Sequence, residues 1–123
     1  MLKIQRTQPT PKTWVLSLQG SVDSSNVAEL VDAIETAFQN GIHQVVIDLA
    51  RVEFVASSGF GCFLTTRDQA IENGGDLVFS AARIQVREIF NLMGLDRLLQ
   101  FFPDIPAAVG HFSKARATAG RRA

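Results

Sequence analysis

The sequence predicts an α/β fold in which a mostly parallel sheet is covered by helices. Short β-branched runs, such as "QVVIDLA" at 44–50 and "DLVFSA" at 76–81, alternate with stretches of helical apolar spacing. Asn-Gly at 40–41 and Asn-Gly-Gly at 73–75 provide stops for two of the helical stretches. Strands that alternate with helices imply right-handed crossovers, so the strands joined in this way run parallel.

The N-terminal segment predicts a β-hairpin. Residues 2–8 and 13–19 have the character of strands, and the two prolines of "QPTPK" between them favour a turn. In "WVLSLQG", Val15 points away from the side shared by Trp14 and Leu16. The two strands are therefore expected to pair as a hairpin.

Four amphipathic helices are expected, over residues 24–40, 59–73 and 84–94 and in a final stretch after Pro103. A last short strand is expected at 98–102, which gives the order β, β, α, β, α, β, α, β, α. Asp23, Ser24 or Ser25 is expected to cap the first helix, and Gly94 suits a left-handed cap at the end of the third. The apolar stripes are Val27, Leu30, Val31, Ile34 and Phe38; Phe60, Phe63, Leu64 and Ile71; Val86, Ile89, Phe90 and Met93; and Ile105, Ala108, Val109 and Phe112.

Composition indicates one ordinary globular domain, placed at residues 1–115. With 12 Lys+Arg and 12 Asp+Glu, the overall charge favours neither nucleic acid nor a membrane surface as a partner. No signal peptide or membrane-spanning run is visible, and the single cysteine is compatible with a reducing compartment, so we expect a cytoplasmic protein. Residues 116–123 are basic and are expected to form a flexible tail, with contact to RNA or lipid as the alternative to a solvated end.

The inventory of reactive side chains does not predict an enzyme. His43 and His111 have no metal-binding spacing, so structural roles and no metal site are expected. Cys62 lies in an apolar helical stretch and is expected to be a small buried residue. "SSGFG" matches neither a phosphate-binding loop nor a nucleophile elbow, and Asp48 and Glu53 show no acid–base pairing.

Ser57 and Ser58 stand where a strand ending at Val55 is expected to pass into a helix starting near Ser58. Two interpretations remain open from these residues alone. A hydroxyl here can cap the first helical N–H groups. Alternatively, a phosphate on the hydroxyl binds the same groups and adds about −1.5 to −2 charges, which would change a partner contact without refolding the domain.

Four motifs in order, "LQGSVDSSN", "VVIDLARVEFVASSGFGCFL", "GGDLVFSA" and "VREIFNLMGLDRLL", resemble a STAS domain, most closely the bacterial anti-sigma factor antagonists of partner-switching systems. The resemblance runs from about residue 2 to residue 115. It implies a four- to five-stranded mixed sheet with an N-terminal hairpin, flanked by about four helices. It also implies a regulatory protein that is not an enzyme and binds no cofactor.

The resemblance further implies a partner and a switch. The unphosphorylated antagonist would bind an anti-sigma factor serine kinase of the ATP-binding GHKL type and so release the sigma factor. The kinase would phosphorylate Ser57, with Ser58 as the alternative, and a metal-dependent serine phosphatase would reverse the step. ATP and metal then belong to the partners. The partner-binding residues implied are Asp23, Ser57, Ser58, Gly59 and Phe60, and Asp23 serves equally well as a helix cap.

Ala56 departs from the family motif, which usually has an aspartate before the serine. The change alters kinase recognition, loosens the loop or indicates a different partner, but it leaves the hydroxyl in place. Thr65, Thr66 and Asp68 are either further contacts or a solvated helix face.

Other functions also remain open. The chain is alternatively a STAS accessory subunit of a transport ATPase complex or a constitutive adaptor, neither of which uses phosphate. A binder of a small molecule at the open sheet edge is a third class. The free chain is expected to be a monomer.

Overall fold

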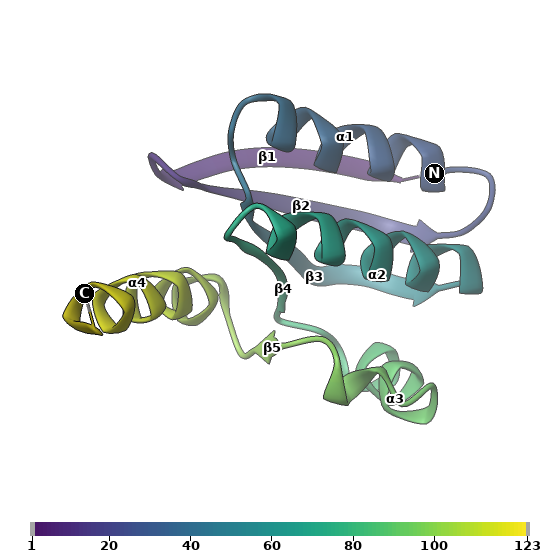
Figure 1. Ribbon diagram of the computed structural model, residues 1–123. Helices are drawn as coiled ribbons and strands as arrows, with labels where there is room; N and C mark the ends of the chain where they lie inside the picture. Colours follow the sequence, from purple (N-terminus) through teal and green to yellow (C-terminus); the bar gives the residue numbers. More distant parts are fainter. Residues whose placement is uncertain (1, 123) are drawn as a thin grey trace.

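The computed structural model describes the backbone of residues 2–122 and the side chains of residues 2–113. No helix in this part of the chain is both long enough and apolar enough to cross a bilayer. The elements, shown in Figure 1, are β1 (Lys3–Thr10), β2 (Thr13–Val22), α1 (Val27–Gln39), β3 (Gln44–Val55), α2 (Ser57–Glu72), β4 (Asp76–Ser80), α3 (Ile84–Leu92), the 3₁₀ turn η1 (Leu95–Arg97), β5 (Phe101–Phe102) and α4 (Ile105–Arg122).

The five strands form one sheet in the order β1-β2-β3-β4-β5. The first pair is antiparallel and closes at Thr10 opposite Thr13, which confirms the predicted hairpin. The other three pairs are parallel, joined by α1, α2 and α3, so the α/β fold with a mostly parallel sheet is confirmed. The order of elements along the chain is the expected one.

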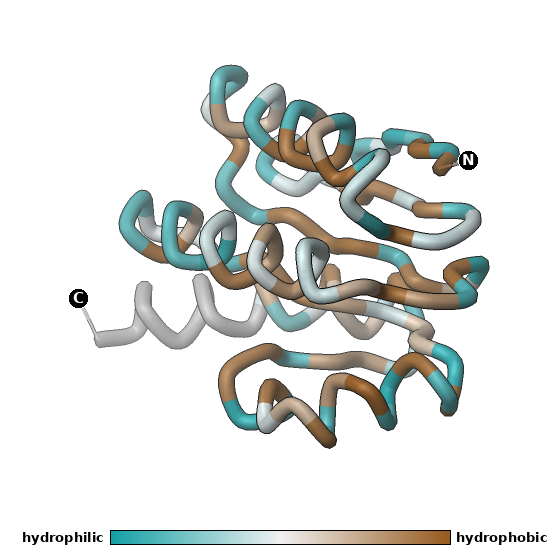
Figure 2. Tube along the Cα trace, turned by 90° about the vertical axis from the view of Figure 1, so that its right-hand side faces the viewer, coloured by the Kyte–Doolittle hydropathy of each residue, from teal (hydrophilic) through white to brown (hydrophobic). Residues whose placement is uncertain are grey.

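Each face of the sheet has its own core, because successive strand residues point to opposite sides. Leu16, Ile47 and Phe79 belong to the larger core, which α1, α2 and α3 cover. Val15, Val46 and Val78 belong to the smaller core, which α4 covers with Ala108 and Phe112. Figure 2 shows α1, α2 and α3 side by side on the near side of the strands, with apolar and polar residues alternating along each helix.

Aromatic rings join α2, α3, β4 and β5 inside the larger core. The Phe90 ring of α3 lies 4.8 Å from the ring centroid of Phe60, 4.9 Å from that of Phe101 and 5.6 Å from that of Phe79. Phe63 adds an edge contact to Phe79 at 4.9 Å. Edge-to-face and offset contacts at these separations are favourable, so Phe90 fastens α3 to three other elements.

Some expectations about the elements were wrong. Ile71 and Met93 were placed on buried stripes, but 44% and 56% of their surfaces are exposed, because each lies near the end of its helix where the packing stops. β3 extends beyond the apolar run at 44–50 and ends at Val55, as expected, since β2 pairs with it along its whole length. Helix α4 extends to Arg122, while the side chains of residues 114–123 lie outside the described ones, so the flexible tail at 116–123 stays a prediction.

Candidate functional site: the start of helix α2

Helix α2 begins at Ser57, directly after a single extended residue. Ala56 has φ −84° and ψ 171°, and its N–H donates to the carbonyl of Val22 at 2.8 Å. This bond prolongs the pairing of β2 with β3 by one residue, so the chain turns into the helix immediately afterwards. Ala56 is therefore the N-cap, and the prediction that Ser57 or Ser58 caps the helix is wrong.

The two serines differ in exposure. Ser57 is exposed to solvent, whereas the Oγ atom of Ser58 is buried and has no hydrogen-bond partner among the described residues. No side chain caps α2, and the first N–H groups of a helix have no partner within the helix. The N-terminus of α2 is therefore an uncapped positive dipole end with one accessible hydroxyl beside it.

Gly59 allows the first turn of α2 to lie directly on the strand ends. A Cβ atom at this position would lie 2.7 Å from Cγ1 of Val55 and 2.9 Å from Cγ1 of Val22. Both valines are buried and belong to the ends of β3 and β2. A larger residue would therefore push the Ser57 end of the helix away from the sheet.

We expect Gly59→Ala to lower the free energy of unfolding by about 1–2 kcal/mol, because the added methyl overpacks the contact with the two valines. Gly61→Ala is the matched control, since a Cβ there meets nothing within 4 Å. Alanine at position 61 should instead stabilise α2 by about 0.5–1 kcal/mol. Urea denaturation of both variants measures the difference, and equal changes would contradict the close approach at Gly59.

Asp23 lies in a hydrogen-bonded turn between β2 and α1. Its carboxylate accepts from both the hydroxyl and the N–H of Ser25, the latter at 2.9 Å, and its carbonyl accepts from the N–H of Val27 at 2.9 Å. These bonds, first that from the Ser25 hydroxyl, lower the pKa of Asp23 below its ordinary value. The turn holds an ionised carboxylate at the surface.

The expectation that Asp23, Ser24 or Ser25 caps α1 is wrong, because the turn occupies those residues and the helix starts only at Val27. Asn26 is the N-cap. It makes no side-chain cap bond; its side chain instead accepts from the N–H of Asp23 at 3.0 Å and donates to the carbonyl of Ser21 at 2.9 Å. Asn26 thus fixes the turn, and the sequence reasoning missed it.

The Ala56–Val22 bond brings the two predicted site segments together. Asp23 follows Val22 in the chain, and Ser57 follows Ala56. The hydrogen bond between Val22 and Ala56 therefore places the acidic turn beside the uncapped start of α2. Both lie at the carboxyl ends of parallel strands, where α/β sheets commonly present their functional groups.

Comparison with known proteins now identifies this arrangement. Residues 4–108 match the STAS domain. This chain belongs to the STAS domain family. Its sequence is 32% identical over 89 residues to BtrV of Bordetella bronchiseptica, to which an anti-sigma factor antagonist role is ascribed; the match covers 72% of this chain and 74% of BtrV.

Solved structures share the fold of this STAS domain. An anti-sigma factor antagonist from Mycobacterium paratuberculosis has a TM-score of 0.80 at 24% identity, over 90% of this chain and 93% of that one. The Bacillus cell fate determinant SpoIIAA in its phosphorylated form has a TM-score of 0.65 at 24% identity, over 82% of this chain and 92% of that one.

Gly59 and Phe60 were expected on the partner surface of the STAS domain, but both are buried. Only 5% of the surface of Phe60 is exposed, because its ring packs edge-on against Phe90. These two residues lie on the buried side of the first turn of α2 and pack it against the core.

Thr66 is also buried, with its hydroxyl donating to the carbonyl of Cys62 at 2.7 Å, so it belongs neither to a solvated face nor to an exposed contact. Thr65 and Asp68 are exposed.

A shallow groove runs beside Ser58 between α1 and α2. Its lining residues are Val27, Val31, Glu35, Ser58, Gly61, Cys62, Thr65, Thr66 and Gln69. Burial, followed by the charge of Glu35, raises the pKa of Cys62 to about 11. The prediction of a small buried cysteine is confirmed.

At pH 8 we expect iodoacetamide to label Cys62 in the folded chain about a hundredfold more slowly than in the urea-unfolded chain, because only the thiolate reacts. The rate should rise with pH up to about 11, the pKa of the thiol. Mass spectrometry of timed samples measures both rates, and equal labelling of folded and unfolded chains would contradict the raised pKa.

Residues 2–113 contain no group of three His, Cys, Asp or Glu side chains that could hold a metal. His43 stacks on Phe38 at 5.4 Å between ring centroids. His111 lies 5.1 Å from Phe102 and 5.6 Å from Phe112. Both imidazoles therefore serve as packing groups.

Proposed function

We propose that this STAS domain is an anti-sigma factor antagonist whose binding is switched by phosphorylation of Ser57. The observation that carries the proposal is the exposed Ser57 hydroxyl at the uncapped N-terminus of α2, one backbone bond away from the acidic turn of Asp23. The sequence similarity to BtrV over most of both chains supports the same role. The output is then regulation of transcription through a sigma factor.

The proposed partner is an anti-sigma factor serine kinase of the ATP-binding GHKL type. It binds the surface formed by Asp23, Ser57 and Ser58, and Gly59 and Phe60 position that surface. The kinase transfers the γ-phosphoryl group of ATP to Oγ of Ser57, with loss of the hydroxyl proton and release of ADP. A metal-dependent serine phosphatase hydrolyses the ester and restores the hydroxyl. The ATP and the metal are supplied by these two enzymes.

Ser57 is preferred to Ser58 as the acceptor because of exposure. A kinase must reach the hydroxyl oxygen, and Oγ of Ser58 is buried beside α1 while Ser57 is exposed. After transfer, the phosphate lies at the positive end of the helix dipole, where free N–H groups can donate to it.

Ala56 strengthens this arrangement. An aspartate at an N-cap position accepts hydrogen bonds from the N–H groups of the first helical turn. The methyl group of Ala56 cannot do so, and these donors stay available for the phosphate. The missing acid thus favours binding of the phosphate by the backbone.

The test incubates the chain and its Ser57→Ala and Ser58→Ala variants with ATP and a purified GHKL-type anti-sigma factor serine kinase from the same organism, followed by mass spectrometry. One phosphate on wild type and on Ser58→Ala, and none on Ser57→Ala, is the expected result. Absence of phosphate from all three, together with stable binding to the kinase, would replace the switch with a constitutive adaptor. Co-purification with a transport ATPase in place of a kinase would indicate an accessory subunit.

A further inference from the structure

The sheet face opposite α1, α2 and α3 is only partly covered. Helix α4 contacts β3, β4 and β5 on this face, and its apolar cluster extends no further than Val15 and Val46. Beyond them the face carries polar side chains of β1, β2 and β3, which lie in register. One row across the three strands is Gln5, Ser17 and Asp48, and the next is Lys3, Gln19 and Arg51.

A β-bulge in β3 determines which β3 residue lies in the second row. Ser17 pairs with Asp48, but Gln19 pairs with Arg51, so two steps along β2 correspond to three along β3. In a regular strand, residues three apart point to opposite faces. The bulge brings Arg51 to the same face as Asp48, which is the kind of redirection that β-bulges commonly provide next to sites.

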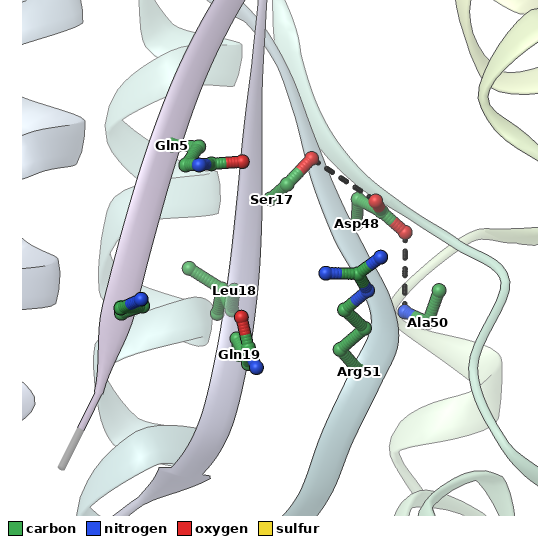
Figure 3. A pocket seen from close by; sticks show the side chains of 8 residues that line it. Gln5, Ser17, Leu18, Gln19, Asp48, Ala50 and Arg51 are labelled. Carbon is green, nitrogen blue, oxygen red and sulfur yellow. Dashed lines mark hydrogen bonds between the residues drawn. The ribbon is translucent and has the colours of Figure 1, made fainter.

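Figure 3 shows that the carboxylate of Asp48 already has two donors. One oxygen accepts from the Ser17 hydroxyl at 3.0 Å, and the other accepts from the N–H of Ala50 at 3.1 Å. The Asp48 carboxylate makes no ion pair with Arg51. Both ion pairs among residues 2–113 belong to Arg67.

Three cationic side chains, those of Lys3, Arg51 and Arg83, lie around the second row, and none of them forms an ion pair with a carboxylate of residues 2–113. A hollow of about 460 Å³ is lined by Lys3, Gln19, Gly20, Arg51, Glu53 and Arg83. Arg83 reaches it from the β4–α3 connection, and its Nε donates to the carbonyl of Ala50 at 3.0 Å. That bond orients the guanidinium and leaves its terminal N–H groups free for another acceptor. Gly20 has a φ of 115° and no side chain to fill the hollow.

We propose that this hollow binds a small anion with two linked phosphate groups, at a site separate from Ser57. Lys3 and Arg51 are two strands apart, about 10 Å between their backbones, and Arg83 stands beyond Arg51. Long cationic side chains at this spacing can contact both phosphate groups of a diphosphate. A guanidinium group can donate two parallel hydrogen bonds to two oxygens of one phosphate. The amide of Gln19 supplies a neutral donor. Glu53 is the one acid facing this hollow, and it opposes binding.

The experiment titrates inorganic pyrophosphate into the full chain by calorimetry at low ionic strength. Saturable binding is expected, weakened at least about tenfold by Arg51→Gln and by Arg83→Gln, since each removes a charge-assisted contact. Glu53→Gln should tighten binding. Added salt should weaken it, because the attraction is electrostatic and solvent-accessible.

Lys12→Gln is the matched control. It removes the same charge from the turn at the other end of the same hairpin, seven residues before Gln19 and more than about 20 Å away along the strand. It should leave the affinity within about twofold. Amide shifts in NMR spectra should fall on β1, the end of β2 and β3. No saturable binding at millimolar pyrophosphate, an equal loss in Lys12→Gln, or shifts centred on the start of α2 would overturn the proposal.

Discussion

Ser57→Asp is expected to weaken binding to the partner kinase by about a hundredfold, while the domain stays folded. The substitution places a permanent charge at an exposed point of the proposed interface, next to the ionised Asp23 turn. A desolvated or repelled charge at an interface costs several kcal/mol. Calorimetric titration of the kinase with each form measures the change.

The stability of the free Ser57→Asp domain shows whether a loss of binding comes from the added charge or from unfolding. A carboxylate in the first turn of a helix interacts favourably with the dipole, so Ser57→Asp should raise the stability of the free domain by about 0.3–1 kcal/mol. Ser57→Ala is the neutral control and should bind like wild type. Loss of binding in both variants would show that the hydroxyl itself is the contact, and unchanged affinity in Ser57→Asp would refute a charge-operated switch.

Phe90→Ala is expected to lower the free energy of unfolding by about 3–5 kcal/mol, the range for removing a fully buried aromatic ring. None of its surface is exposed, and its ring contacts Phe60, Phe79 and Phe101. The loss should reach the functional site, because Phe60 lies in the first turn of α2 and packs edge-on against Phe90. Amide hydrogen exchange at residues 57–63 should therefore become faster.

Leu92→Ala provides the comparison. It removes an apolar side chain two residues further along the chain, but 87% of the surface of Leu92 is exposed. Its stability should stay within about 0.5 kcal/mol of wild type. Denaturation in urea compares the two variants. Similar losses at positions 90 and 92 would show that α3 is held by something other than the aromatic cluster.

The sequence predicts the order and type of the elements well, because apolar periodicity records which side of each element is covered. The alternation expected at Trp14, Val15 and Leu16 is present, with Trp14 and Leu16 in the larger core and Val15 in the smaller one. The stripe of α1 was also predicted correctly, with Leu30 and Ile34 fully buried. These features depend on residues that are close in sequence.

The helix starts and the bulge could not be predicted in this way. Ala56 is the N-cap because its N–H pairs with Val22, which is more than thirty residues away in the sequence. The shift of register before Arg51 likewise exists only once β2 and β3 have paired. Phe60 is different: its spacing to Phe63 already predicted a buried position, and the family resemblance led instead to an exposed one.

The hydrogen bond from Ala56 to Val22 also bears on how fast the proposed switch responds. With the start of α2 fixed to the end of β2, and Gly59 seated on the same two strands, the binding surface is already assembled in the free domain. Removal of the phosphate then leaves no slow rearrangement to wait for. In the proposed switch, the delay between dephosphorylation and capture of the kinase would then be set by diffusion and by the concentrations of the two proteins.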